Sequence, residues 1–159
     1  RLHEPTRNGP SMNQSGNGAF QAAVLIVEDH APMRTALYDL IRHSFPRLRV
    51  IDAYDGATAL AHFDAHRPSF VLVDINLPDA NGLDLARTMK KRSPATMVAV
   101  TSIETNAHIA AQARAAGAAV FVGKDELFDE IVPLIRAAVT LRGWMDVFSV
   151  PADPLQSYA

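Results

Sequence analysis

Side chains that could perform chemistry together stand at the ends of four short apolar runs. Glu28-Asp29 follows the first run, Asp74 ends the second, Thr101 ends the third and Lys124 follows the fourth. Clustered carboxylates repel one another, and a hard divalent cation such as Mg²⁺ relieves that repulsion. An aspartate beside such a cation can attack a phosphoryl group, while a lysine and a hydroxyl stabilise the transferring oxygens. These residue types predict Mg²⁺-dependent phosphoryl transfer, provided that the fold brings them together.

The runs that carry these residues have the length and composition of buried strands. Strands are expected at the following segments: residues 22–27, 49–54, 69–74, 96–101 and 119–122. The second of these is less apolar than the others, which is typical of an edge strand. Apolar residues at helical spacing follow each strand, for example over residues 31–45 and 106–116. This alternation predicts an α/β fold, namely a flavodoxin-like doubly wound five-stranded parallel sheet of order 2-1-3-4-5 with five helices.

Such a sheet places the carboxyl ends of all strands along one edge, where ligands of open α/β sheets bind. Strands one and three are neighbours in this order, so Glu28, Asp29 and Asp74 should converge on one crevice. Thr101 and Lys124 should then lie on its far side. The predicted topology therefore assembles the predicted chemistry.

Pro133 complicates the last helix, because a proline in a helix interior removes one hydrogen bond and clashes with the preceding turn. A helix start near Asp129 or Glu130 would put the proline in or just past the first turn, at small cost. We therefore expect the late start.

Composition separates one domain from two tails. Residues 1–21 are rich in Gly, Pro, Asn and Ser and are predicted to be a disordered tail, with residues 1–11, before Met12, interpreted as a leftover of expression. Residues 22–143 have the composition of a single globular domain. Residues 144–159, which include Trp144, show no clear period and are a tail or a linker.

Overall composition favours some classes of protein over others. The formal net charge of −2 gives no electrostatic case for binding nucleic acid. No apolar run approaches the roughly 20 residues of a membrane span, and there is no cysteine for disulfide or thiolate chemistry. A cytoplasmic location is the expectation.

Four stretches of sequence resemble a known family in their order and spacing. They are Leu25-Ile26-Val27-Glu28-Asp29-His30, Val71-Leu72-Val73-Asp74-Ile75-Asn76-Leu77-Pro78 with Gly82, Val98-Ala99-Val100-Thr101-Ser102, and Phe121-Val122-Gly123-Lys124. Over residues 22–143 the chain resembles the receiver domain of a two-component response regulator. The Glu28-Asp29-His30 start and the Lys124-Asp125 pair look most like receivers of the LuxR/NarL type. Asn81 departs mildly from the family, in which aspartate is common before the glycine.

The resemblance implies a role for each residue of the Mg²⁺ site. Asp74 resembles the phosphoacceptor, and Asp29 resembles the direct Mg²⁺ ligand. Glu28 resembles the acidic neighbour that acts through water, and Asn76 the residue whose backbone carbonyl binds the metal. Mg²⁺ is thus the implied cofactor.

The resemblance also implies a switch and its partners. Thr101 and Lys124 resemble the pair that contacts the phosphoryl oxygens, and Phe121 the aromatic whose rotamer follows the threonine. A sensor histidine kinase or a phosphotransfer protein would supply the phosphoryl group, and the surface of helix four, strand five and helix five would then change. Self-association is a further expectation, with transcription as the output if the chain is part of a DNA-binding regulator. Neither nucleic acid nor a membrane is expected to bind the chain itself.

Other interpretations of the same residues remain open. The fold could serve as a phosphorylation-independent protein-binding module, although the full acidic and basic set argues against it. A phosphatase with an aspartyl nucleophile would carry a second aspartate at position 76 as general acid, and Asn76 cannot fill that role. We therefore expect a self-phosphorylating and self-dephosphorylating switch rather than a metabolic enzyme. Phe121 could simply be core, and His62 and His66, which lie four residues apart, are interpreted as a solvated helix face rather than as metal ligands.

Overall fold

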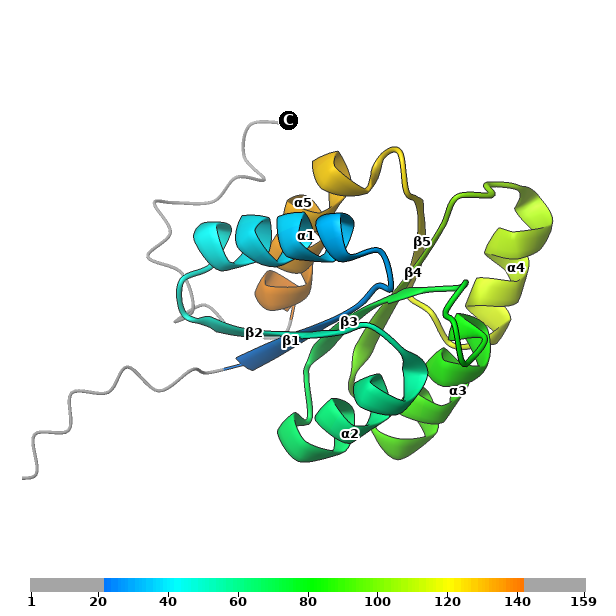
Figure 1. Ribbon diagram of the computed structural model, residues 1–159, viewed down its shortest axis with the longest axis horizontal. Coiled ribbons are helices and arrows are strands. Elements are labelled where there is room, and N and C mark those ends of the chain that lie inside the picture. Colours follow the sequence, from blue (N-terminus) through cyan, green and yellow to red (C-terminus); the bar gives the residue numbers. More distant parts are fainter. Residues whose placement is uncertain (1–21, 142–159) are drawn as a thin grey trace, which may run out of the picture.

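The computed structural model describes residues 22–141, in which strands and helices alternate (Figure 1). The elements are β1 (Ala22–Val27), α1 (Ala31–Ser44), β2 (Leu48–Ala53), α2 (Gly56–His66), β3 (Phe70–Asp74), α3 (Gly82–Arg92), β4 (Met97–Ser102), α4 (Ala107–Ala115), β5 (Val120–Gly123) and α5 (Leu127–Leu141). The strands lie within about one residue of the bounds expected from the apolar runs. The predictions for both tails concern residues outside the described part of the chain.

All strand pairs are parallel, and the sheet order is β2-β1-β3-β4-β5. The predicted flavodoxin-like topology is therefore confirmed, and the less apolar β2 lies at an edge as expected. Val27 of β1 pairs with Val73 of β3, so the residues that follow these two strands emerge side by side. Asp74 pairs with Thr101 of β4 in the same way. This register brings the ends of β1, β3 and β4 to one place.

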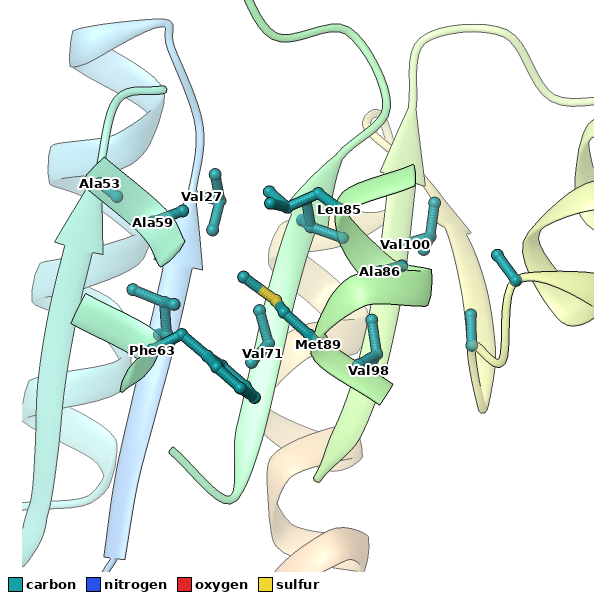
Figure 2. Packing of buried hydrophobic residues seen from close by; sticks show 14 of the residues in the cluster. Val27, Ala53, Ala59, Phe63, Val71, Leu85, Ala86, Met89, Val98 and Val100 are labelled. Atoms are coloured by element: carbon teal, nitrogen blue, oxygen red, sulfur yellow. The ribbon is translucent and has the colours of Figure 1, made fainter. Parts of the chain in front are cut away.

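Helices cover both faces of the sheet, with α1 and α5 on one face and α2, α3 and α4 on the other (Figure 1). Figure 2 shows the second layer, in which Phe63 of α2 and Met89 of α3 pack against Val71 of β3. Burial of a large apolar side chain of this kind stabilises the fold by about 1.5–3 kcal/mol. β3 is buried along its whole length, so the strand that carries Asp74 is held on every side.

Four helices begin with a polar cap directly after the site edge of the sheet. The side chains of His30, Asp55, Asn81 and Asn106 accept hydrogen bonds from backbone N–H groups in the first turns of α1, α2, α3 and α4. A cap of this kind stabilises a helix by about 1 kcal/mol. The amino ends of the helices thus start close to the carboxyl ends of the strands.

The expected late start of the last helix is wrong. α5 begins at Leu127, which places Pro133 inside the helix. Leu127 is fully buried, and the Glu126 carbonyl accepts hydrogen bonds from the N–H groups of Asp129 and Glu130 at 3.1 and 3.0 Å. Burial of this leucine and closure of the extra turn offset the hydrogen bond that Pro133 cannot make.

Within residues 22–141 no helix has both the length and the apolar character that crossing a membrane requires.

Candidate functional site

Three carboxylates gather where β1 and β3 end. Asp74 and Glu28 are each only 1% exposed, whereas Asp29 is open to solvent. One oxygen from each of the three lies within 4.8 Å of the others. Burying two carboxylates without a cation is costly. An oxygen-only donor set that includes one solvent-exposed carboxylate fits a hydrated Mg²⁺.

Lys124 forms ion pairs with both buried carboxylates. Its Nζ lies 2.6 Å from Asp74 Oδ2 and 3.0 Å from each oxygen of Glu28, and it donates hydrogen bonds to Asp74 and to Glu28 Oε1. Burial alone would lower the pKa of Lys124, but the hydrogen bonds to Asp74 and Glu28 outweigh it and raise that pKa. Burial raises the pKa of Glu28, and the hydrogen bond from Lys124 only partly opposes this. The lysine is therefore firmly protonated and fixed beside Asp74.

The loop after Asp74 turns back sharply and fixes the acidic side chain. Asp74 Oδ1 accepts a hydrogen bond from the Asn76 backbone N–H at 3.0 Å, and the Gly82 N–H donates to the Ile75 carbonyl at 2.7 Å. Asn76 and Asn81 form an isolated antiparallel bridge across this loop. The predicted metal-binding carbonyl of Asn76 therefore belongs to a loop whose position is defined by Asp74 itself.

Thr101 is a buried residue whose hydroxyl has no hydrogen-bond partner within residues 22–141. The residue is 1% exposed, and its Oγ1 makes no hydrogen bond there. A buried polar group without a partner costs about 1–3 kcal/mol. Because Thr101 pairs with Asp74 in the sheet, an incoming group on Asp74 would find this hydroxyl available.

We expect Thr101→Val to leave the free energy of unfolding unchanged or to raise it by about 1 kcal/mol, because the valine removes an unsatisfied hydroxyl. The matched control is Thr96→Val, since Thr96 is equally buried but its hydroxyl donates to the Pro68 carbonyl at 3.0 Å and lies 2.9 Å from Ser93 Oγ. The free energy of unfolding of that control, measured in urea, should fall by about 1 kcal/mol. Equal losses in both variants would show that the Thr101 hydroxyl has a partner in the resting protein.

Phe121 lies in β5 and is partly buried against the core layer beneath α2, α3 and α4. It pairs with Val100, one residue before Thr101. This position is compatible both with a core aromatic and with a side chain that moves when Thr101 moves. The two interpretations therefore both stand.

His62 and His66 lie on α2, with ring centroids 5.9 Å apart. Among the described residues, the group of three or more metal-binding side chains is Glu28, Asp29 and Asp74, which does not include either histidine. Within residues 22–141, the structure thus places no third ligand beside this histidine pair.

Two residues that sequence reasoning missed hold the loops of the site. Arg34 donates from Nη1 to the Glu28 carbonyl at 2.9 Å. Asp79 accepts hydrogen bonds from the backbone N–H groups of Gly56 and Ala57 at 2.7 and 3.0 Å, and so ties the β3–α3 loop to the start of α2. The Asp79 contacts have no local sequence signal, because Asp79 and Gly56 lie 23 residues apart. Arg34 looks in the sequence like an ordinary charge on the surface of its helix.

The Asp79 contacts predict a pH-dependent contribution to stability. The hydrogen bonds from Gly56 and Ala57 lower the pKa of the Asp79 carboxyl below its usual value of 3.8. A depressed folded-state pKa stabilises the protein above the unfolded pKa, and this stabilisation is lost as the pH falls through the folded value. We expect Asp79→Ala to lower the melting temperature at pH 7, with the difference from the parent shrinking below pH 4.

The matched control for this prediction is Asp39→Asn, an exposed acid on α1. It should leave the melting temperature nearly unchanged across the same pH range. A difference between Asp79→Ala and the parent that stays constant down to the lowest pH would contradict the assigned role of the carboxylate.

Known proteins resemble this chain in sequence and in structure. A family model described as the response regulator receiver domain matches residues 24–136. The DNA-binding transcriptional activator DevR/DosR of Mycobacterium tuberculosis is 35% identical over 124 residues, which cover 77% of this chain and 57% of that protein. The protein-glutamate methylesterase/protein-glutamine glutaminase of Pyrococcus horikoshii is 35% identical over 126 residues, which cover 72% of this chain and 34% of that protein.

The chain therefore matches only about one third to three fifths of the length of these relatives. One solved structure consists almost entirely of the region that matches this chain. It is the signal receiver domain of response regulator NarL from Mycobacterium tuberculosis, which is 29% identical with a TM-score of 0.68 and covers 75% of this chain and 96% of that one. The sequence match, the sheet order and the carboxylate group of Glu28, Asp29 and Asp74 all point to one family. This chain belongs to the response regulator receiver domain family.

Proposed function

We propose that the chain is a phosphorylation-controlled switch in which Asp74 accepts a phosphoryl group in a Mg²⁺-dependent reaction. The observation that carries this proposal is the pairing of buried Asp74 with Lys124 at 2.6 Å, next to Glu28, Asp29 and the unpartnered hydroxyl of Thr101. Each group has a task in phosphoryl transfer, and together they form one compact site.

The donor would be a phosphohistidine of a sensor histidine kinase or of a phosphotransfer protein. A carboxylate oxygen of Asp74 attacks phosphorus, the phosphorus–nitrogen bond breaks, and the leaving imidazole nitrogen keeps the electron pair and takes up a proton. The product is an acyl phosphate on Asp74. Lys124 already donates a hydrogen bond to this carboxylate. Its ammonium group would also stabilise the negative charge on the phosphoryl oxygens after transfer. Thr101 could donate to one of the same oxygens.

The carboxylates of Glu28, Asp29 and Asp74 and the backbone carbonyl of Asn76 would hold Mg²⁺. When bound, the ion would balance the negative charge of the carboxylates and of the phosphoryl oxygens. Asp29 is the exposed member of the group and suits direct coordination with water completing the shell. Buried Glu28 stays engaged with Lys124, which suits a role through water.

The surface formed by α4, β5 and α5 would read out the phosphorylated state. Thr101 lies beside Val122 of β5, and the Lys124 N–H donates to the Ser102 carbonyl at 3.0 Å, so a change at the end of β4 reaches β5 directly. Two large apolar side chains are exposed nearby in sequence, Ile103 at 75% and Phe128 at 42%. They offer contact area for a partner or for a second copy of the chain.

Control of transcription is the output that we favour, because the relative DevR/DosR is a DNA-binding transcriptional activator. The second candidate is a phosphorylation-independent binding module. It would leave the buried Glu28 and Asp74 carboxylates and the unpartnered Thr101 hydroxyl without a task.

The test is the intact mass of the protein after incubation with acetyl phosphate, with and without Mg²⁺. We expect a gain of one phosphoryl group that requires Mg²⁺, that Asp74→Asn abolishes and that Asp84→Asn, on exposed α3 surface, retains. No gain in any condition, together with no binding of Mg²⁺ or beryllofluoride, would favour the phosphorylation-independent module.

A further inference from the structure

The turn between β1 and α1 carries two of the three carboxylates of the site, and the Arg34 side chain contacts the backbone of this turn. Arg34, on the first turn of α1, donates from Nη1 to the Glu28 carbonyl at 2.9 Å and reaches the Asp29 carbonyl at 3.5 Å. Its Nε lies 3.3 Å from Asp52 Oδ2 at the end of β2. We propose that Arg34, anchored by Asp52, is a positioning residue that sets the metal-binding geometry of Glu28 and Asp29. The proposal rests on the proposed function of the site.

The Arg34 contacts tie the turn to the edge strand. The Glu28 N–H donates to the Ala53 carbonyl of β2 at 3.0 Å, so the acidic pair is attached to β2 by a backbone bond. The bridge from Asp52 through Arg34 to the carbonyl of Glu28 is a second attachment to the same strand. These two attachments to β2 together define the direction of the turn.

The turn needs this support because its carboxylates repel each other. Oxygens of Glu28, Asp29 and Asp74 lie within 4.8 Å of one another, and Asp29 is the exposed member of the group. Without a restraint, the simplest relief would be rotation of Asp29 away from the group. Contacts that orient the backbone of a ligand pair typically raise metal affinity about 10- to 100-fold.

The guanidinium group is suited to this task in a way that an ammonium group is not. Arg34 uses Nη1 for the carbonyls and Nε for the Asp52 carboxylate, so one planar group fixes the angle between the turn and β2. Its side chain is 19% exposed and that of Asp52 is 44% exposed, and the hydrogen bond to the Glu28 carbonyl is partly buried. Lysine at this position would keep the charge but would lose the fixed angle.

A purely electrostatic role for Arg34 predicts the opposite change in Mg²⁺ affinity. If Arg34 were only a positive charge beside an acidic cluster, it would repel Mg²⁺, and its removal would tighten binding. If Arg34 positions the ligands, its removal weakens binding although the repulsion is gone. The sign of the change in Mg²⁺ affinity therefore separates the two roles.

The experiment is calorimetric titration of the full chain with Mg²⁺ alone, without any phosphoryl donor. We expect Arg34→Gln and Arg34→Lys each to weaken binding about tenfold, and Asp52→Asn, which keeps an acceptor oxygen, to weaken it less. The matched control is Arg87→Gln on α3, whose side chain pairs with exposed Asp84. Circular dichroism without Mg²⁺ checks the fold, and Arg34→Lys carries the test if Arg34→Gln is unfolded.

The positioning role would be overturned if Arg34→Gln or Arg34→Lys bound Mg²⁺ as tightly as the parent or more tightly. The proposed function would still stand in that case if the parent bound Mg²⁺ and gained a phosphoryl group. Failure of the proposed function would show in the parent itself. A parent that binds Mg²⁺ but accepts no phosphoryl group leaves the Arg34 prediction measurable. A parent that binds no Mg²⁺ would refute both.

Discussion

Replacing Lys124 with methionine is expected to lower the free energy of unfolding at pH 7 by about 3 kcal/mol and to stop phosphoryl transfer. The side chains of Glu28 and Asp74 are each 2% exposed, and Lys124 is the cation that bridges them. Its removal leaves two buried carboxylates facing each other, and one of them must take up a proton for the fold to persist. Methionine keeps most of the side-chain volume, so the loss reports the charge rather than a cavity.

The expected signature of this variant is its response to Mg²⁺. In the parent, Lys124 competes with a cation for the Asp74 carboxylate, so Lys124→Met should bind Mg²⁺ more tightly and recover stability when Mg²⁺ is added. Urea unfolding with and without Mg²⁺ measures both effects. The control is Lys91→Met on the exposed end of α3, which should change little. Parent-like stability of Lys124→Met without Mg²⁺ would contradict the ionic bridge.

Gly82→Ala is the second change with a large expected effect. A Cβ atom at this position would overlap the Asp74 carbonyl oxygen and would lie 2.7 Å from the Ile75 Cα atom. Both neighbours are backbone, so relief requires displacement of the chain around Asp74, the proposed phosphoacceptor. We expect a loss of about 3 kcal/mol in unfolding free energy and a slower phosphorylation of the folded fraction.

Helix propensity predicts the reverse sign for Gly82→Ala. Gly82 is the first residue of α3, and alanine is a better helix former than glycine by about 1 kcal/mol. A variant that is more stable than the parent in urea unfolding would therefore show that the loop can move away from Asp74 without cost. A large loss, with slower phosphorylation by acetyl phosphate, would show that the loop after Asp74 is held by close backbone contact.

The positions of the side chains in the candidate site could be predicted from sequence because they depend on one rule of the fold. Asp74 ends an apolar strand, and Glu28 follows another, so parallel pairing alone brings them together. Lys124 reaches the same place from the end of β5, although its bridge to both carboxylates depends on side-chain geometry that the sequence does not reveal.

The features that could not be predicted depend on contacts between distant parts of the chain. The start of α5 is set by burial of Leu127 in the core, which local preference around Pro133 does not reveal. Asp79 and Arg34 resemble ordinary loop and helix-surface charges in the sequence, and their roles come from partners on α2 and β2. The free hydroxyl of Thr101 is likewise a property of packing rather than of residue type.

The most direct measurement is to locate the phosphoryl group in the chain. After incubation with acetyl phosphate and Mg²⁺, borohydride reduces an aspartyl phosphate to homoserine, and peptide mass spectrometry identifies the altered position. We expect homoserine at position 74 alone, dependent on Mg²⁺ and absent from Asp74→Asn. Modification at another carboxylate, or none at position 74 while the protein gains phosphoryl mass, would contradict the assignment of Asp74 as the acceptor.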